Sequence, residues 1–142
     1  MASIFSRIID GELPGRFVWR DERCAAMLTI APLRPGHTLV VPVDEIDHWT
    51  DCPPDLLAHL IAVAREIGRA QHAAFAPRRV ALLVVGDEVP HTHLHVVPMD
   101  SLADIDLSLV DPAPDPAALD AAAVTLRTAL HDLGHTGTVP DA

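Results

Sequence analysis

Three histidines at alternate positions are the residues of this sequence best suited to chemistry. They are His91, His93 and His95, within the segment VPHTHLHVVP that runs from Val89 to Pro98. The apolar residues around them predict a β-strand over residues 89–97. Side chains of a strand alternate between its two faces, so the three imidazoles are expected on one face and the intervening residues on the other.

Imidazole side chains grouped in this way suit reactions at phosphorus. Neutral imidazole is a nucleophile, and protonated imidazole donates hydrogen bonds to phosphate oxygens. Three protonated imidazoles on one face would repel one another, which favours a neutral set or a set that faces an anion. The pattern therefore indicates a site for a phosphate-containing ligand.

Two other interpretations of the histidines remain open. Partly buried histidines can simply form hydrogen bonds with the backbone, although three on one face favour a shared function. Three imidazoles can also bind zinc. Adjacent side chains on one straight strand do not surround an ion tetrahedrally, however, and a fourth ligand would be needed. We therefore expect no metal ion and no other cofactor.

Composition limits the class of protein. The chain has 142 residues, of which 49% are hydrophobic, and this suits a single domain with a real core. A formal net charge of −10 disfavours nucleic-acid partners. The sequence has no apolar run of membrane-spanning length and no secretory leader at its start, so we expect a cytoplasmic protein without a membrane partner. Cys24 and Cys52 lack CxxC spacing, which predicts neither a disulfide nor a zinc site.

The elements around the histidines predict an α+β domain. Apolar residues at helical spacing, such as Leu56, Leu60, Val63 and Ile67, mark one long helix. We expect a mostly antiparallel five-stranded sheet, the long helix, a short N-terminal helix and an extra C-terminal helix. The expected helices are 3–11, 53–75 and 116–133, the expected strands are 17–20, 24–30, 37–42, 80–85 and 89–97, and residues 98–114 are expected to form a loop.

The histidine segment resembles the signature of the histidine triad (HIT) family, which is His-x-His-x-His followed by two apolar residues. Two further segments support this resemblance: residues 4–14 are similar to the family's N-terminal helix and turn, and residues 35–42 are similar to a strand that ends in Val-Pro. The similarity covers about residues 3–100. Within a single domain of residues 1–142, it leaves 101–142 as a loop and a C-terminal helix.

The resemblance implies a mechanism. In that family the middle histidine attacks the α-phosphate of a nucleotide-like substrate, which makes His93 the nucleophile that forms a phosphohistidine. The resemblance places His91 and His95 beside the phosphate, where they orient oxygens or assist the leaving group. It also implies that His37, on a neighbouring strand, supports the other three. This chemistry requires no metal.

The resemblance also implies where a nucleoside would bind. The matching positions for an apolar slot are Ile4, Phe5, Ile8, Met27 and Ile30, although membership of the core explains these residues equally well. Thr29 stands where the family commonly has an aspartate that holds the ribose hydroxyls. Gly86 fits the loop near the phosphate, but Asp87 and Glu88 bring negative charge there. These departures indicate a divergent member with an unusual substrate.

We therefore expect a metal-independent hydrolase or transferase that acts on a nucleotide-type ester, anhydride or phosphoramidate. A nucleotide-binding or regulatory module with little turnover is one alternative, and a metal-dependent hydrolase that uses the same histidines is another. Ser6 stands where some HIT proteins carry a zinc-binding cysteine, so no structural zinc is expected. The resemblance further implies a homodimer, and the apolar strand at 80–85 is compatible with one.

Overall fold

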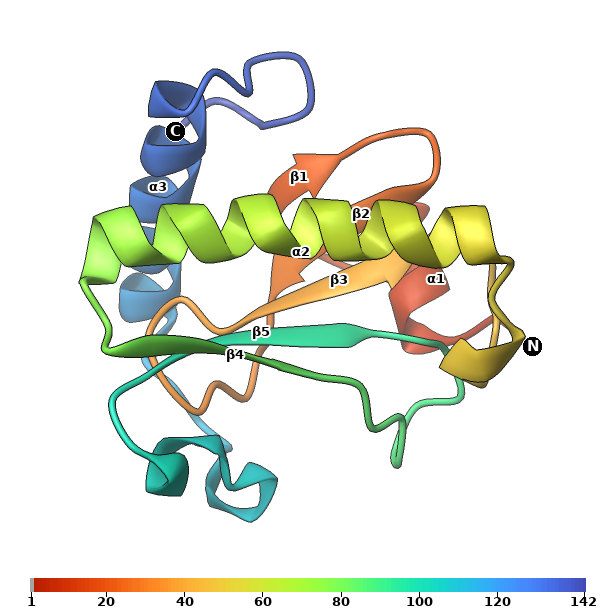
Figure 1. Ribbon diagram of the computed structural model, residues 1–142, viewed down its shortest axis with the longest axis horizontal. Coiled ribbons are helices and arrows are strands. Elements are labelled where there is room, and N and C mark those ends of the chain that lie inside the picture. The colour runs from red at the N-terminus through yellow and green to blue at the C-terminus, as the bar shows by residue number, and fades with distance from the viewer. Residues whose placement is uncertain (1) are drawn as a thin grey trace.

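Five antiparallel strands form one sheet in the computed structural model, which describes residues 2–142. The long helix α2, Pro54–Phe75, crosses one face of this sheet (Figure 1). The arrangement confirms the predicted α+β class with its antiparallel sheet. The order in the sheet is β1-β2-β3-β5-β4, and the strands are β1 (Phe17–Arg20), β2 (Cys24–Leu28), β3 (Thr38–Pro42), β4 (Arg79–Leu83) and β5 (Leu94–Met99).

Two more helices complete the domain. Helix α1, Ile4–Ile9, begins after Ser3, whose hydroxyl accepts a hydrogen bond from the backbone N–H of Ser6 at 3.1 Å. Helix α3, Pro116–Asp132, begins after Asp115, which caps it in the same manner. Short 3-10 turns lie at Trp49–Asp51, Leu102–Ile105 and Leu107–Leu109, the last two within the predicted loop. Within residues 2–142, none of the helices combines the length and the apolar character needed to cross a membrane.

The sheet has a separate apolar core on each face. On the face that α2 covers, α2 and α3 pack together, and Leu60, Ile67, Leu126 and Leu130 are fully buried. On the other face a smaller cluster lies against α1 and contains Phe5, Ala25, Met27, Leu39 and Val41. Helix α3 therefore covers the domain's own core, a role that the sequence alone left open.

The strand register places one histidine on the face that carries the smaller core. Leu39 of β3 pairs with Met27 on one side and with His95 on the other, and His95 pairs in turn with Leu83 of β4. Residues paired in this way share a face of the sheet. His95 therefore points away from α2, toward the side on which α1 lies.

The prediction of a strand over residues 89–97 was wrong in its first half, because β5 begins only at Leu94. Pro90 has no N–H to donate, and the N–H of His91 turns back to the carbonyl of Val89 at 2.8 Å. Thr92 then donates its N–H to the carbonyl of Ile46 at 2.7 Å, outside any strand ladder. Only His95 lies in regular strand, so alternation does not explain how the three histidines come together. Strands β2 and β4 also end two residues earlier than predicted.

The burial of α3 generates a test of stability. Replacing the fully buried Leu126 with alanine should lower the free energy of unfolding by about 2–5 kcal/mol, because it leaves a cavity between α3 and the sheet. Chemical denaturation measures this change. The control is Val124→Ala on the same helix, where the side chain is 45% exposed, and the change should stay within about 0.5 kcal/mol. Equal effects of the two substitutions would contradict the packing of α3 described above.

Candidate functional site

The hydrogen bonds of His93 leave one of its ring nitrogens free to react. Its Nδ1 lies 2.7 Å from the backbone carbonyl of His91. A carbonyl can only accept, so Nδ1 carries the proton and Nε2 keeps its lone pair. The side chain is 8% exposed, and burial lowers its pKa below the usual value. His93 is therefore a neutral imidazole with Nε2 available as a nucleophile.

His37 and His95 form a directed pair. The backbone N–H of Leu33 donates to His37 Nδ1 at 3.1 Å, so the proton of a neutral His37 must sit on Nε2. That Nε2 lies 2.9 Å from His95 Nδ1 and donates to it. The remaining nitrogen of His95, Nε2, then carries a hydrogen that it can donate to a ligand.

Burial also keeps this pair uncharged at neutral pH. Desolvation, together with a smaller contribution from the neighbouring His95, lowers the pKa of His37 to about 3. Desolvation lowers the pKa of His95 to about 4, with a smaller contribution from His93. The ring centroids of His93 and His95 lie 5.0 Å apart. The site thus presents one lone pair and one N–H donor side by side.

His91 anchors the group. It is fully buried, its Nε2 lies 2.8 Å from the carbonyl of Pro42, and its Nδ1 lies 2.6 Å from the hydroxyl of Ser3. Since both ring nitrogens are engaged, His91 contributes its backbone carbonyl to His93 and offers no free nitrogen. Phe5 packs against both rings, with centroid distances of 5.8 Å to His91 and 4.9 Å to His93.

Ser3 and Glu45 are two residues near the site that the sequence analysis missed. Glu45 accepts hydrogen bonds from the backbone N–H of Ser3 and, at 2.9 Å, from the Ser6 hydroxyl. The bond from Ser3 is the main reason that the pKa of Glu45 is lowered. The cluster ties the start of α1 to His91. A serine at the start of the predicted helix 3–11 was a detectable feature, whereas the contact with Glu45, 42 residues away, was not.

The side chains of this cluster are poor ligands for a structural zinc ion. Besides His91 Nδ1, they offer the hydroxyls of Ser3 and Ser6 and the carboxylate of Glu45. Structural zinc sites are built mainly from cysteine thiolates and imidazoles. The hydrogen bonds within the cluster already account for its geometry.

The residues predicted to form an apolar slot divide into two groups. Met27 is 2% exposed and Ile8 packs beside it, so both belong to the core under α1. Ile4 and Ile30 are 43% and 69% exposed and remain free for contact with a ligand. Phe5 is buried at 8%, and its ring borders His91 and His93.

The other residues that were predicted to bind the substrate lie on turns. The Thr29 hydroxyl accepts a hydrogen bond from the N–H of Ala31 at 3.2 Å. Gly86 has a φ of 73°, a left-handed conformation that favours glycine, and it starts the turn on which Glu88 is exposed. The four histidines are thus brought together by hydrogen bonds and ring contacts, while Thr29, Gly86 and Glu88 lie on turns.

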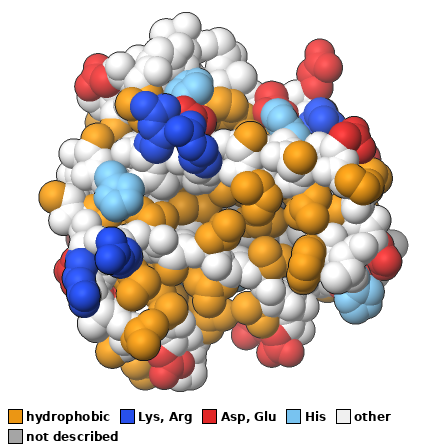
Figure 2. All heavy atoms as spheres, viewed as in Figure 1, with side chains coloured by type: hydrophobic (Ala, Val, Ile, Leu, Met, Phe, Trp, Pro, Cys, Tyr) orange, Lys and Arg blue, Asp and Glu red, His pale blue; other side chains and the backbone are white. Residues whose placement is uncertain are grey.

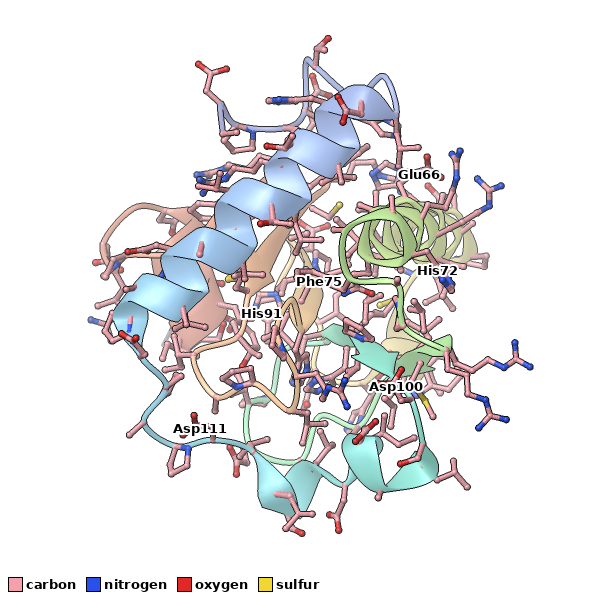
Figure 3. All side chains as sticks on the ribbon, turned by 90° about the vertical axis from the view of Figure 1, so that its left-hand side faces the viewer. Glu66, His72, Phe75, His91, Asp100 and Asp111 are labelled. Atoms are coloured by element: carbon pink, nitrogen blue, oxygen red, sulfur yellow. The ribbon has the colours of Figure 1, made fainter. Side chains whose placement is uncertain are left out.

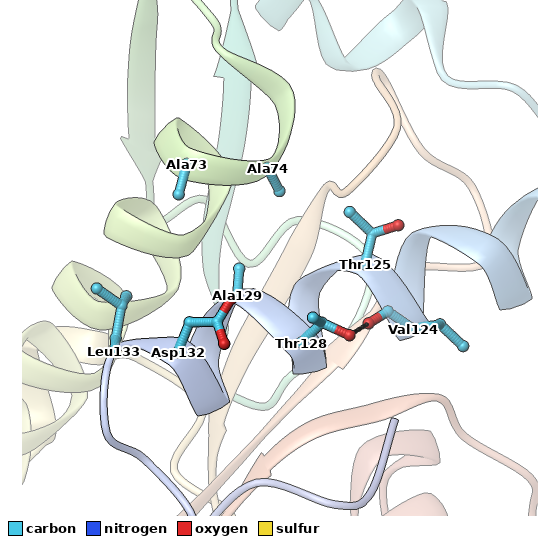
Figure 4. A pocket seen from close by; sticks show the side chains of 8 residues that line it. All are labelled: Ala73, Ala74, Val124, Thr125, Thr128, Ala129, Asp132 and Leu133. Atoms are coloured by element: carbon cyan, nitrogen blue, oxygen red, sulfur yellow. Dashed lines mark hydrogen bonds between the residues drawn. The ribbon is translucent and has the colours of Figure 1, made fainter.

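One groove lies apart from the histidines. It runs between the end of α2 and the second half of α3 (Figure 4). Its lining includes Ala73 and Ala74 from α2, Thr128 from α3 and Leu133 just after α3. None of its lining residues belongs to the histidine cluster. Its walls are small and mostly apolar, so this groove contributes no side chain to the histidine cluster.

A comparison with protein families gives the decisive observation: a model of the HIT domain matches residues 10–102. The chain belongs to the HIT family. An uncharacterized HIT-like protein of Methanocaldococcus jannaschii is 35% identical over 67% of this chain and 77% of its own length. An uncharacterized HIT-like protein of Mycobacterium tuberculosis is 36% identical over 69% of this chain and 72% of its own length.

Solved structures of HIT proteins share the fold. A zinc-bound histidine triad family protein from Mycobacterium smegmatis superposes with a TM-score of 0.81 at 31% identity, covering 94% of this chain and 96% of that one. A hypothetical histidine triad nucleotide-binding protein from Sulfolobus tokodaii gives 0.80 at 26% identity, covering 91% and 92%. Both comparisons cover more of the chain than the HIT-domain match, which ends at residue 102.

The lowered pKa values of the buried histidines predict a loss of stability in acid. An unfolded histidine has a pKa near 6.5, whereas folded His37 and His95 have values of about 3 and 4. Between pH 6.5 and pH 4 the unfolded chain therefore binds more protons, and the free energy of unfolding falls as the pH is lowered. Each such histidine contributes a slope of up to about 1.4 kcal/mol per pH unit.

Urea denaturation at several pH values tests this linkage. His37→Gln removes one titrating group while keeping a polar side chain, and it should reduce the slope by about one proton, or ~1.4 kcal/mol per pH unit. The matched control is His72→Gln, because His72 is exposed on α2. An unchanged slope in His37→Gln would show that His37 is not held uncharged in the folded protein.

Proposed function

We propose that this HIT protein is a metal-independent hydrolase or nucleotidyl transferase that acts on nucleotide-like phosphate esters, anhydrides or phosphoramidates. The observation that carries the proposal is the hydrogen bond from His93 Nδ1 to the carbonyl of His91, which leaves the Nε2 lone pair free. Membership of the HIT family supports a nucleotide-directed role. The Sulfolobus tokodaii neighbour, a hypothetical histidine triad nucleotide-binding protein, agrees with this role.

The proposed reaction has two displacements at phosphorus. His93 Nε2 forms a bond to phosphorus while the bond to the leaving group breaks, and the leaving group keeps the bonding electron pair and takes up a proton. Water then attacks phosphorus, the bond to His93 breaks, and neutral imidazole is regenerated as a proton passes to solvent. In a transferase, an acceptor hydroxyl or phosphate takes the place of water.

His95 stabilises charge in both steps. Its Nε2–H, fixed by the bond from His37 to Nδ1, donates to a phosphate oxygen or to the leaving group. A phosphate anion beside His95 favours its protonated form and so raises its pKa from the low value of the free site. His95 then becomes a proton donor only when substrate is bound.

The surroundings of the histidines favour an apolar substrate group over a strongly held ribose. Exposed Ile4 and Ile30 offer apolar contact. The Thr29 hydroxyl, already engaged with Ala31, cannot accept hydrogen bonds from both ribose hydroxyls in the way a carboxylate can. The two ring nitrogens of His91 are also engaged, so the histidines do not offer three free nitrogens to a metal ion.

A covalent adduct tests the proposed nucleophile. After brief mixing with an adenosine phosphoramidate, mass spectrometry should detect a nucleotidyl adduct on His93. His93→Ala should abolish the adduct and lower turnover by about a thousandfold or more, as removal of a nucleophile does, with the fold unchanged. His72→Ala, at an exposed position on α2, is the control. Binding without adduct or turnover would favour the nucleotide-binding module, and full activity of His93→Ala would exclude this nucleophile.

We also propose that two copies of the chain associate through β4. Strand β4 is at the edge of the sheet, and its unpaired backbone groups can continue the antiparallel sheet with the same strand of a second copy. Hydrophobic side chains gather over β4 and the adjacent face of α2 (Figure 2). Among them, Leu82 and Ile61 are 48% and 42% exposed.

Leu82→Arg tests this dimer. The substitution places a charge at the centre of the proposed contact and should convert the protein to a monomer in analytical ultracentrifugation. The control is Leu102→Arg, since Leu102 is 79% exposed on a turn outside this surface. A monomeric wild-type protein, or a dimer that survives Leu82→Arg, would contradict the proposed interface.

A further inference from the structure

Gln71 is a polar residue in the apolar stripe of α2. It lies four positions after the buried Ile67 and is itself fully buried. Its Nε2 donates hydrogen bonds to the carbonyls of Gly36 and Val96, both at 2.9 Å. Two carbonyl partners determine which end of the amide faces them, because only the NH2 group can donate.

The other end of the same amide is left without a partner. Within residues 2–142, Gln71 Oε1 is buried and accepts no hydrogen bond. A buried acceptor without a partner is destabilising, and the two hydrogen bonds that the same amide donates offset this cost. The two donated hydrogen bonds must therefore account for the presence of glutamine.

The two carbonyls adjoin the paired histidines. Gly36 immediately precedes His37, and Val96 immediately follows His95. Thr38 and Val96 are the outermost pair of the β3–β5 ladder at this end. Gln71 therefore joins the two strands where their own pairing stops, one residue from each partner in the His37–His95 hydrogen bond.

A second residue of α2 fixes the same turn. Phe75, one helical turn beyond Gln71, points from the end of α2 into the molecule, while His72 points outward (Figure 3). Gly36 has a φ of 87°, and a Cβ built there would collide with the Phe75 ring. The Thr38 hydroxyl also donates to the Gly36 carbonyl, at 2.8 Å. The backbone before His37 is thus held from α2 and from β3.

We propose that Gln71 is a positioning residue that fixes the His37–His95 hydrogen bond and, through it, the tautomer in which His95 turns its Nε2–H toward the substrate. Without the bridge, the ends of β3 and β5 can separate and His95 Nδ1 loses its donor. The alternative tautomer then carries its proton on Nδ1 and presents a lone pair to the phosphate oxygens, which repels them. The catalytic consequence rests on the proposed function, whereas the effect on the tautomer does not.

Gln71→Met is the decisive variant, because methionine has a similar length and removes both the donors and the unpaired oxygen. Ile67→Val is the matched control on the buried face of the same helix, since Ile67 bonds to neither carbonyl. Nitrogen-15 NMR of the imidazoles reports the tautomers without any need for turnover. Wild type and Ile67→Val should show His95 protonated on Nε2 alone, and Gln71→Met should show a mixture of both tautomers.

Kinetics supply the second readout. In Gln71→Met, kcat should fall by roughly tenfold while KM changes little. This loss is smaller than the roughly hundredfold loss of rate that a displacement of a catalytic group by about 1 Å can cause. Phe75→Leu, which loosens the same turn without touching the amide, should shift the tautomers in the same direction and serves if Gln71→Met fails to fold. A wild-type His95 tautomer in folded Gln71→Met would overturn the proposal. If wild type shows the expected tautomer but no turnover, the proposed function fails and the positioning role stands.

Discussion

The hydrogen bond between His93 Nδ1 and the backbone carbonyl of His91 is the interaction on which the rest of the site depends. It assigns the proton of His93 to one nitrogen and leaves the other as a lone pair. A carbonyl inside a regular ladder would already be paired with a neighbouring strand. The segment from Val89 to His93 therefore has to leave the sheet. The turn at His91 and the bonds of Thr92 to Ile46 hold it there.

Burial and the direction of hydrogen bonds, more than formal charges, determine the electrostatic properties of the site. Desolvation lowers the pKa of His37, His93 and His95, so that each is uncharged in the free site at neutral pH. Arg34, on the turn before His37, is paired with Asp100 and Asp104 at 3.0 Å and 2.8 Å. Neutral N–H donors can bind a phosphate inside a protein whose net charge is −10, because a short directed hydrogen bond outweighs a distant, solvent-screened charge.

The sequence predicted the elements well and the contacts between them poorly. The apolar stripe of α2, the short strands and the histidine spacing are local patterns, and the α+β sheet and the HIT family followed from them. The structure does bring the histidines together. The reason offered for this, alternation along one strand, was wrong, because His95 is the only one of the three that lies in β5. The point at which β5 begins depends on the bonds of Thr92 to Ile46, which is distant in sequence, and no local pattern reveals that contact.

The residues that support the histidines were the harder part to predict. Ser3, Glu45 and Gln71 act through partners 88, 42 and 35 positions away. The sequence analysis did not single out Gln71, although it is a polar residue in the apolar stripe of α2, and its carbonyl partners are evident only from the fold. Met27 and Ile8 show the converse, since positions matched to a ligand slot turned out to fill the core under α1.

Main-chain atoms supply several of the partners that give the histidines their roles. The carbonyl of His91 orients His93, the N–H of Leu33 orients His37, and the carbonyl of Pro42 anchors His91. Replacement of the Leu33 side chain leaves its backbone N–H in place. This part of the site therefore tolerates substitutions as long as the backbone conformation is preserved. Transplanting the four histidines into another scaffold would therefore reproduce the residues without their protonation pattern. A designer would have to copy the backbone trace of the two turns as well.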